Sequence, residues 1–259
     1  MASNETVGSE FDLSGRVAIV TGAGRGMGYH IALALARYGA DLVICSRTVS
    51  ELEKLGAEVQ DLGRRVFIKQ MDIKKVPDIV AMANDAVDFF GHIDILINNA
   101  GINRPQWAED VTEENWDNVM ETNLKGLFFC AQAVGKVMIK QKKGKIINVS
   151  SQAGSVGLLQ RAAYCSSKGA VNQLTRVLAI EWAKHNINVN AIAPTFIETP
   201  FTAPMFQNEG FKEYVLGNIP LGRVGKPEDV IGGVLYLASD ASDLVTGHIL
   251  LIDGGWTAQ

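Results

Sequence analysis

Short apolar runs alternate with longer segments of helical periodicity along most of the chain. The apolar runs cover residues 16–20, 42–45, 66–68, 93–97, 145–149, 187–191 and 248–252. Helical spacing of apolar residues extends over residues 27–38, 49–62, 77–90, 113–140 and 162–184, and Pro227 begins one more helix. Strands that alternate with helices need crossover connections. The pattern therefore predicts a doubly wound α/β fold, with one parallel sheet of about seven strands and helices on both faces.

Two stretches depart from this alternation. Residues 194–220 are rich in Thr, Pro, Phe and Asn and are longer than an ordinary connection, which predicts a substrate lid around residues 195–216. Residues 1–12 are polar and acidic, which predicts a flexible N-terminal arm rather than a secretory signal. No repeat or linker interrupts the remainder, so residues 13–259 are expected to form a single domain.

The composition limits the kinds of ligand and partner that this protein can bind. Of the 259 residues, 47% are hydrophobic and 20% are charged, as in a globular protein with a sizeable core. A formal net charge of −4 argues against nucleic acid, and no apolar run approaches the ~20 residues of a membrane span. The three cysteines and four histidines lack metal-ligand spacing, and the cysteines lack the density of a disulfide scaffold. We expect a cytoplasmic protein that needs no metal, nucleic acid or membrane.

A glycine-rich segment, residues 21–28, lies between the first predicted strand and the first predicted helix. Gly22 permits a tight turn, Gly26 lets the backbone approach a phosphate, and Gly28 lets the helix pack on the sheet. Amides at a helix N-terminus bind pyrophosphate. This segment, with Arg25 and Met27, therefore predicts a dinucleotide site in a Rossmann-type fold.

The spacing of these glycines, three residues and then one, resembles the short-chain dehydrogenase/reductase family, in its branch of roughly 250 residues. The resemblance covers residues 13–255 and includes the motifs Asn98-Asn99-Ala100-Gly101, Asn123, Ser151, Tyr164-x-x-x-Lys168 and Pro194. It implies an enzyme that transfers a hydride between a nicotinamide cofactor and the carbonyl or secondary alcohol of a small molecule.

Four residues match the catalytic positions of that family. Tyr164 and Lys168 stand four apart at the start of a predicted helix, which places both on one face. A nearby cation favours the phenolate, so the pKa of Tyr164 is expected to fall toward neutrality. The resemblance implies that Tyr164 moves the hydroxyl proton and that Ser151 holds the substrate oxygen. It also implies that Asn123 holds a water in a proton relay to Lys168, while Ser150 points into the scaffold.

The end of the second strand distinguishes NAD(H) from NADP(H). A carboxylate there would bind the ribose 2′-hydroxyl, but this chain has Ser46 and Arg47. Arg47, together with Arg25, would neutralise a 2′-phosphate, which favours NADP(H) over NAD(H). The alternative is that Arg47 is a solvated residue at a helix start.

The resemblance assigns further cofactor contacts to three segments. They are Asp72 and Ile73 beside the adenine, Asn99, Ala100 and Gly101 beside the ribose or nicotinamide, and Pro194, Ile197 and Thr199 beside the carboxamide, in addition to Tyr164 and Lys168. Thr195 stands where the family usually has glycine, so the local backbone path is expected to differ.

We expect the substrate to be selected by three segments: residues 104–107, residues 152–160 and the predicted lid. Arg104, Gln152 and Arg161 indicate a polar or acidic substrate, and the tracts at 181–184 and 253–256 resemble those of gluconate and other sugar-acid or polyol dehydrogenases. One alternative is a 3-oxoacyl-[acyl-carrier-protein] reductase, which would need a basic surface beside the lid. Another is a non-catalytic NADP(H)-binding redox sensor, against which the complete catalytic set argues. The family also implies a homotetramer, or a dimer, assembled through the long helices and the C-terminal strand region.

Overall fold

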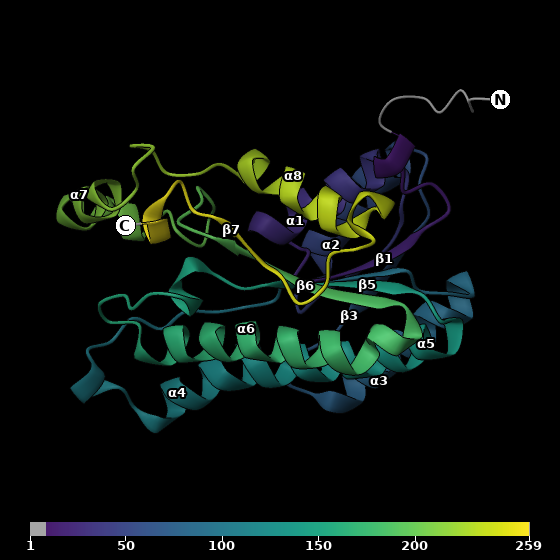
Figure 1. The fold of residues 1–259 in the computed structure, drawn as a ribbon, viewed down its shortest axis with the longest axis horizontal. Helices are drawn as coiled ribbons and strands as arrows, with labels where there is room; N and C mark the ends of the chain where they lie inside the picture. The colour runs from purple at the N-terminus through teal and green to yellow at the C-terminus, as the bar shows by residue number, and fades with distance from the viewer. Residues whose placement is uncertain (1–8, 259) are drawn as a thin grey trace.

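The computed structural model describes residues 9–258, with a single parallel sheet through the centre (Figure 1). Its strands are β1 (Val17–Thr21), β2 (Asp41–Ser46), β3 (Val66–Gln70), β4 (Ile95–Asn98), β5 (Gly144–Val149), β6 (Ile187–Pro194) and β7 (Ile249–Ile252). They follow the order β3-β2-β1-β4-β5-β6-β7, and every neighbouring pair is parallel. The predicted Rossmann-type doubly wound sheet of seven strands is confirmed.

Helices cover both faces of this sheet (Figure 1). On one face lie α1 (Gly26–Arg37), α2 (Val49–Asp61) and α8 (Pro227–Ala238). On the other lie α3 (Val76–Phe90), α4 (Glu113–Met120), α5 (Leu127–Gln141) and α6 (Ala162–Trp182). Successive residues of a strand point to opposite faces, so Ala18 and Val20 join the core under the first group, while Val17 and Ile19 join the core under the second. Burial on both faces explains why the strands are continuously apolar.

The strand order determines where a ligand fits. The chain proceeds outward from β1 to β2 and β3, then crosses back to β4 on the other side of β1. The connections that follow β1 and β4 therefore diverge. In open α/β sheets this divergence creates a crevice at the carboxyl ends of the strands.

The helix predicted over residues 113–140 contains an irregularity at its centre. A π-helical turn, Glu121–Gly126, separates α4 from α5. A methyl group on Gly126 would lie 2.6 Å from the carbonyl oxygen of Ile73, so the helix approaches the loop after β3 closely here. Single π-helical turns occur often at functional sites, and this one contains Asn123.

The predicted lid is more ordered than the sequence pattern indicates. Within residues 195–216 the chain forms a 3₁₀ turn, Met205–Gln207, and most of a further helix, α7 (Glu209–Gly217). The side chain of Asn208 caps α7 by accepting a hydrogen bond from the Phe211 amide (3.0 Å). The prediction of an irregular lid is thus corrected for α7, which lies next to the C-terminal turn in Figure 1.

The predicted N-terminal arm, residues 1–12, falls partly outside the described residues. Its last part, Ser9–Phe11, forms a 3₁₀ turn, and Phe11 packs against the core. Among residues 9–258, no helix is both long enough and apolar enough to cross a membrane.

Candidate active site

A cleft of about 930 Å³ lies at the carboxyl ends of the strands. This volume is at the upper end of the ~300–1,000 Å³ range usual for small-molecule sites. It brings together every residue predicted for cofactor and substrate. These are Gly22, Arg25, Gly26, Met27, Gly28, Ser46, Arg47, Asp72, Ile73, Asn99, Ala100, Gly101, Arg104, Gln152, Arg161, Pro194, Ile197 and Thr199. Of the four predicted catalytic residues, Ser151, Tyr164 and Lys168 line the cleft and Asn123 does not.

The glycine-rich turn has the backbone that only glycine adopts easily. Gly22 and Gly26 have φ values of +64° and +58°. A methyl group on Gly22 would come within 3.0 Å of the Ala100 Cα, so the turn packs directly on the end of β4. This close approach fixes the turn and exposes the start of α1 to the cleft.

Asn99 acts mainly as a brace for this turn. Its side-chain amide donates to the carbonyl oxygens of Thr21 (2.9 Å) and Gly22 (3.1 Å). Thr21 Oγ1 in turn accepts hydrogen bonds from the amides of Asn99 (3.0 Å) and Ala100 (3.1 Å). The predicted contact residue therefore also holds two strand ends together.

The cleft contains polar groups that lack a protein partner. Among the described residues, Thr195 Oγ1 and Asn103 Oδ1 are buried and form no hydrogen bond, and both residues line the cleft. Arg25 precedes α1 without a capping side chain, so the first amides of α1 remain able to bind phosphate. Buried polar groups are normally hydrogen-bonded, so these groups fit a ligand that offers phosphates and hydrogen-bonding atoms, as a nicotinamide dinucleotide does.

Charges of both signs meet at the far end of the cleft, after β2. The exposed Arg47 lies there, and the exposed Arg25, at the start of α1, lines the same cleft. Glu51, in the first turn of α2, was not predicted. A methyl group on Gly24 would come within 2.7 Å of Glu51 Oε2 and 3.1 Å of Ser46 Oγ. The position of Glu51 at the start of the helix that follows β2 was the available signal.

Ser151 and Ser150 point in different directions at the end of β5. Ser151 Oγ donates to Gln152 Oε1 (2.8 Å) and accepts from the Ala153 amide (3.2 Å), so its hydroxyl is oriented at the cleft wall. Ser150 Oγ donates to Asn172 Oδ1 (2.6 Å) inside the protein, as predicted. Gln152 is buried and thus positions the Ser151 hydroxyl.

Tyr164 and Lys168 lie on one face of α6, and Lys168 Nζ is 5.7 Å from the centre of the Tyr164 ring. Burial is the main influence on both groups. It lowers the pKa of Lys168 to about 8. The pKa of Tyr164 is raised, because burial outweighs the opposing effects of the Ser151 hydroxyl and Arg161. The expected fall in the pKa of Tyr164 toward neutrality is therefore wrong, because desolvation dominates.

The Asn123 side chain is fully buried and bonds to the loop that follows β4. Its Oδ1 accepts from the Ile102 amide (2.8 Å), and its Nδ2 donates to the Ile102 carbonyl (2.9 Å) and to Ser167 Oγ (3.1 Å). Lys168 Nζ donates to the Val149 carbonyl (2.7 Å). Asn123 thereby ties α6 and the π-helical turn to one wall of the cleft.

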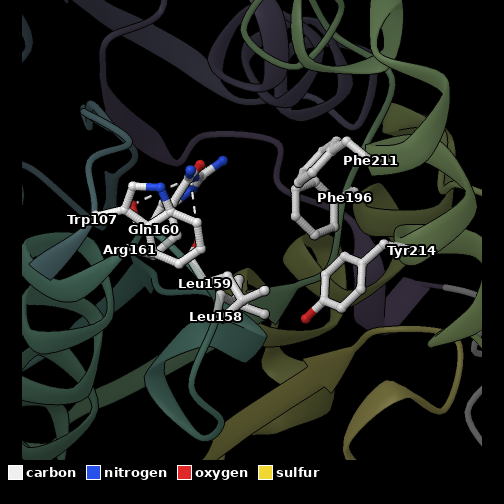
Figure 2. A pocket seen from close by; sticks show the side chains of 8 residues that line it. All are labelled: Trp107, Leu158, Leu159, Gln160, Arg161, Phe196, Phe211 and Tyr214. Carbon is white, nitrogen blue, oxygen red and sulfur yellow. Dashed lines mark hydrogen bonds between the residues drawn. The ribbon is translucent and has the colours of Figure 1, made fainter.

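The predicted substrate residues occupy different environments. Arg104 is exposed at the cleft, whereas only 6% of Arg161 is exposed. Arg161 also lines a second cavity of about 260 Å³, whose other walls include Trp107, Phe196 and Tyr214 (Figure 2). These aromatic residues were not predicted individually from the sequence. The available signal for them was that they lie in the predicted lid and in residues 104–107, the segments expected to select the substrate.

The chain is similar over nearly its whole length to known proteins. The family model described as "Enoyl-(Acyl carrier protein) reductase" matches residues 22–257. The 2-dehydro-3-deoxy-D-gluconate 5-dehydrogenase of Escherichia coli (strain K12) is 44% identical over 252 residues, which cover 97% of this chain and 99% of that protein. The 3-oxoacyl-[acyl-carrier-protein] reductase of Thermotoga maritima is 41% identical over 243 residues, with 94% and 98% covered.

A solved structure also has a fold very similar to that of this chain. The gluconate 5-dehydrogenase from Burkholderia cenocepacia J2315, in complex with NADP and tartrate, has a TM-score of 0.93 and 35% identity, covering 96% of this chain and 98% of that one. These similarities span nearly the whole length of each chain. This chain belongs to the short-chain dehydrogenase/reductase family and is an oxidoreductase that acts on CH–OH groups with a nicotinamide cofactor.

Proposed function

We propose that this enzyme interconverts a secondary alcohol and a carbonyl of a small polar substrate, a sugar acid or polyol, with Tyr164 as proton donor and acceptor. The observation that carries the proposal is the convergence of Ser151, Tyr164 and Lys168 on the cleft that begins at the glycine-rich turn. The similar proteins named for gluconate derivatives support this substrate class.

The bound nicotinamide would donate or accept the hydride. Ser151 would orient the substrate oxygen with its hydroxyl, which Gln152 already holds at the cleft wall. Tyr164 would give its proton to the oxygen during reduction and remove the proton during oxidation. A raised pKa keeps the phenol protonated, so Tyr164 begins as the acid that reduction requires.

Lys168 and Asn123 support this proton transfer in different ways. Lys168 would hold the Tyr164 oxygen and stabilise the phenolate with its ammonium. Asn123 is proposed as a positioning residue because its amide holds the Ile102 backbone and Ser167, which lies next to Lys168.

We propose NADP(H) as the preferred cofactor. Arg47 and Arg25 would bind the 2′-phosphate at the end of β2, while Glu51 would weaken that preference by repulsion. Cys45, Cys130 and Cys165 are all free thiols, which fits a reducing compartment, and we propose that the enzyme acts in the cytoplasm.

The substitution Tyr164→Phe tests the proposal. The variant should lose turnover by a factor of about a hundred or more while it keeps its affinity for NADP(H), because only the proton donor is removed. Turnover is followed by nicotinamide absorbance, and affinity by nicotinamide fluorescence. Tyr38→Phe, on an exposed tyrosine, is the matched control. Unchanged turnover in Tyr164→Phe would show that another group transfers the proton, whereas a wild type that binds NADP(H) without any turnover would favour a redox sensor.

A further inference from the structure

The smaller cavity adjoins the active-site cleft. Leu158, Arg161 and Phe196 line both spaces. Figure 2 shows Trp107 and Arg161 on one side of this cavity and Phe196, Phe211 and Tyr214 of the lid region on the other. A substrate that occupies the cleft near Tyr164 therefore has room to extend between α6 and the lid.

Arg161 is a buried cation that forms no ion pair within residues 9–258. Its guanidinium contacts are long or weak: 3.5 Å to the Leu159 carbonyl, 3.3 Å to the Gln160 carbonyl and 3.9 Å to Met205 Sδ. It also lies 5.9 Å from the centre of the Phe211 ring. A guanidinium has five donors, and burial without an anion is costly, so this group is suited to bind an anion from the cavity.

The residue before Arg161, Gln160, has a strained backbone conformation that hydrogen bonds hold in place. Gln160 has a φ of +60°, a conformation that costs a non-glycine residue roughly 1 kcal/mol or more. Its carbonyl accepts a hydrogen bond from the Gln106 backbone amide (3.0 Å). The side-chain oxygen of Gln106, Oε1, accepts a hydrogen bond from Asn115 Nδ2 (2.9 Å). Strain that is retained in this way is typical of functional segments.

Arg161 is also close to the reacting group. It is the N-cap residue of α6 and precedes Tyr164, in the first turn of that helix, by three residues. Arg161 and Tyr164 both line the active-site cleft, which places the guanidinium and the phenol on the same cavity wall. An anion on Arg161 would therefore belong to the same small molecule as the alcohol or carbonyl at Tyr164.

We infer that Arg161 binds a carboxylate of the substrate in the smaller cavity, so that the enzyme selects hydroxy or keto acids over uncharged polyols. Carboxylates accept two parallel hydrogen bonds from a guanidinium, and only 6% of Arg161 is exposed, so the pair would form largely away from water. Because Arg161 also contacts Met205 and Phe211, the carboxylate would be enclosed against the lid. The inference rests on the proposed function and names one substrate class within it.

The test compares D-gluconate with its uncharged counterpart D-glucitol as substrates for wild type and Arg161→Met. The ratio of kcat/KM for the acid to kcat/KM for the polyol should fall roughly ten- to a hundred-fold in Arg161→Met, mainly through KM for the acid. Arg161→Lys should restore part of the ratio because it keeps the charge. Arg37→Met changes an exposed arginine at the end of α1 and should leave the ratio unchanged.

Binding measured without turnover separates this inference from the proposed function. Tartrate and D-gluconate should raise the melting temperature of the wild-type enzyme with NADP+ and do so less in Arg161→Met. If Tyr164→Phe abolishes turnover but the acid-to-polyol ratio is the same in wild type and Arg161→Met, the proposed function stands and the inference fails. A wild type that oxidises D-glucitol and shows neither activity nor thermal shift with either acid also overturns the inference.

Discussion

At the scale of single residues, cofactor choice depends on charges at the end of β2. Arg47→Ala should raise KM for NADP+ roughly ten- to a hundred-fold, because a charge-assisted contact to the 2′-phosphate is lost. KM for NAD+, which lacks that phosphate, should change little. Steady-state kinetics with both cofactors measures the two effects, and Arg37→Ala on the exposed end of α1 is the control. An equal change for both cofactors would show that Arg47 does not contact the phosphate.

Lys168 illustrates how a functional group reduces stability. Burial holds its pKa at about 8 instead of 10.5, so below pH 8 the folded protein contains a buried ammonium that costs about 3 kcal/mol. Between about pH 8 and pH 10.5, the Lys168 side chain keeps its proton in the unfolded chain but has released it in the folded protein. The stability of the wild type therefore rises with pH in this window.

Lys168→Met should reveal this dependence in protein free of nucleotide. The stability of the variant relative to wild type should decrease by about 3 kcal/mol as the pH rises from about 8 to 10.5. Urea unfolding at several pH values measures it, with Lys184→Met at an exposed position as control. A difference that stays constant with pH would contradict the buried-ammonium interpretation.

At the scale of elements, the π-helical turn depends on the close approach of Gly126 to Ile73. Gly126→Ala would place a methyl group 2.6 Å from the Ile73 carbonyl oxygen, so the free energy of unfolding should fall by about 1–3 kcal/mol. Ile73 lines the cleft, so affinity for the cofactor should also fall.

Gly232→Ala is the matched control for this substitution. Gly232 lies inside α8 with nothing within 4 Å of the added methyl group. Alanine should therefore stabilise the protein by about 0.5–1 kcal/mol. Chemical denaturation measures both variants, and equal effects in the two would refute the role of the close contact with Ile73.

Local patterns predict most elements but miss two. The periodicity of residues 113–140 is that of one helix, because a π-helical turn changes the pattern of apolar residues only slightly. α7 is nine residues long, too short for a distinct period, and its apolar face becomes visible only where Val215 packs with Ile219 and Trp256.

For the whole molecule, the family resemblance implies a homotetramer or a dimer, and exposed apolar positions provide the means to test for such a contact. Ile180 on α6 is 79% exposed and Leu251 on the edge strand β7 is 40% exposed. Unpaired edge strands and large exposed apolar side chains are typical of surfaces that another chain covers.

Ile180→Asp should therefore lower the molar mass measured by light scattering, because burying an unpaired carboxylate in a subunit contact is costly. Leu62→Asp, at a 42% exposed position beyond α2, should leave the mass unchanged. A mass equal to one chain in the wild type, or an unchanged oligomer in Ile180→Asp, would contradict an interface at this position.

The candidate site was largely predictable because its motifs are local. The turn at residues 21–28 depends on glycines with positive φ, and the pairing of Tyr164 with Lys168 depends on helical spacing. Two features were not predictable: the hydrogen bonds from Asn99 to the glycine-rich turn and the buried Thr195 hydroxyl without a hydrogen bond. Both depend on groups far away in the sequence.

Patterns within short stretches of the sequence predict the order of strands and helices along the chain and the phosphate-binding turn, because each depends on residues that are close together in the chain. The proposed reacting groups follow from the family resemblance. The electrostatics depend on the tertiary structure. The pKa values of Tyr164 and Lys168 depend on how completely distant segments exclude water from them. The same is true of Arg161, which acquires its place between two cavities only when α6 and the lid pack together.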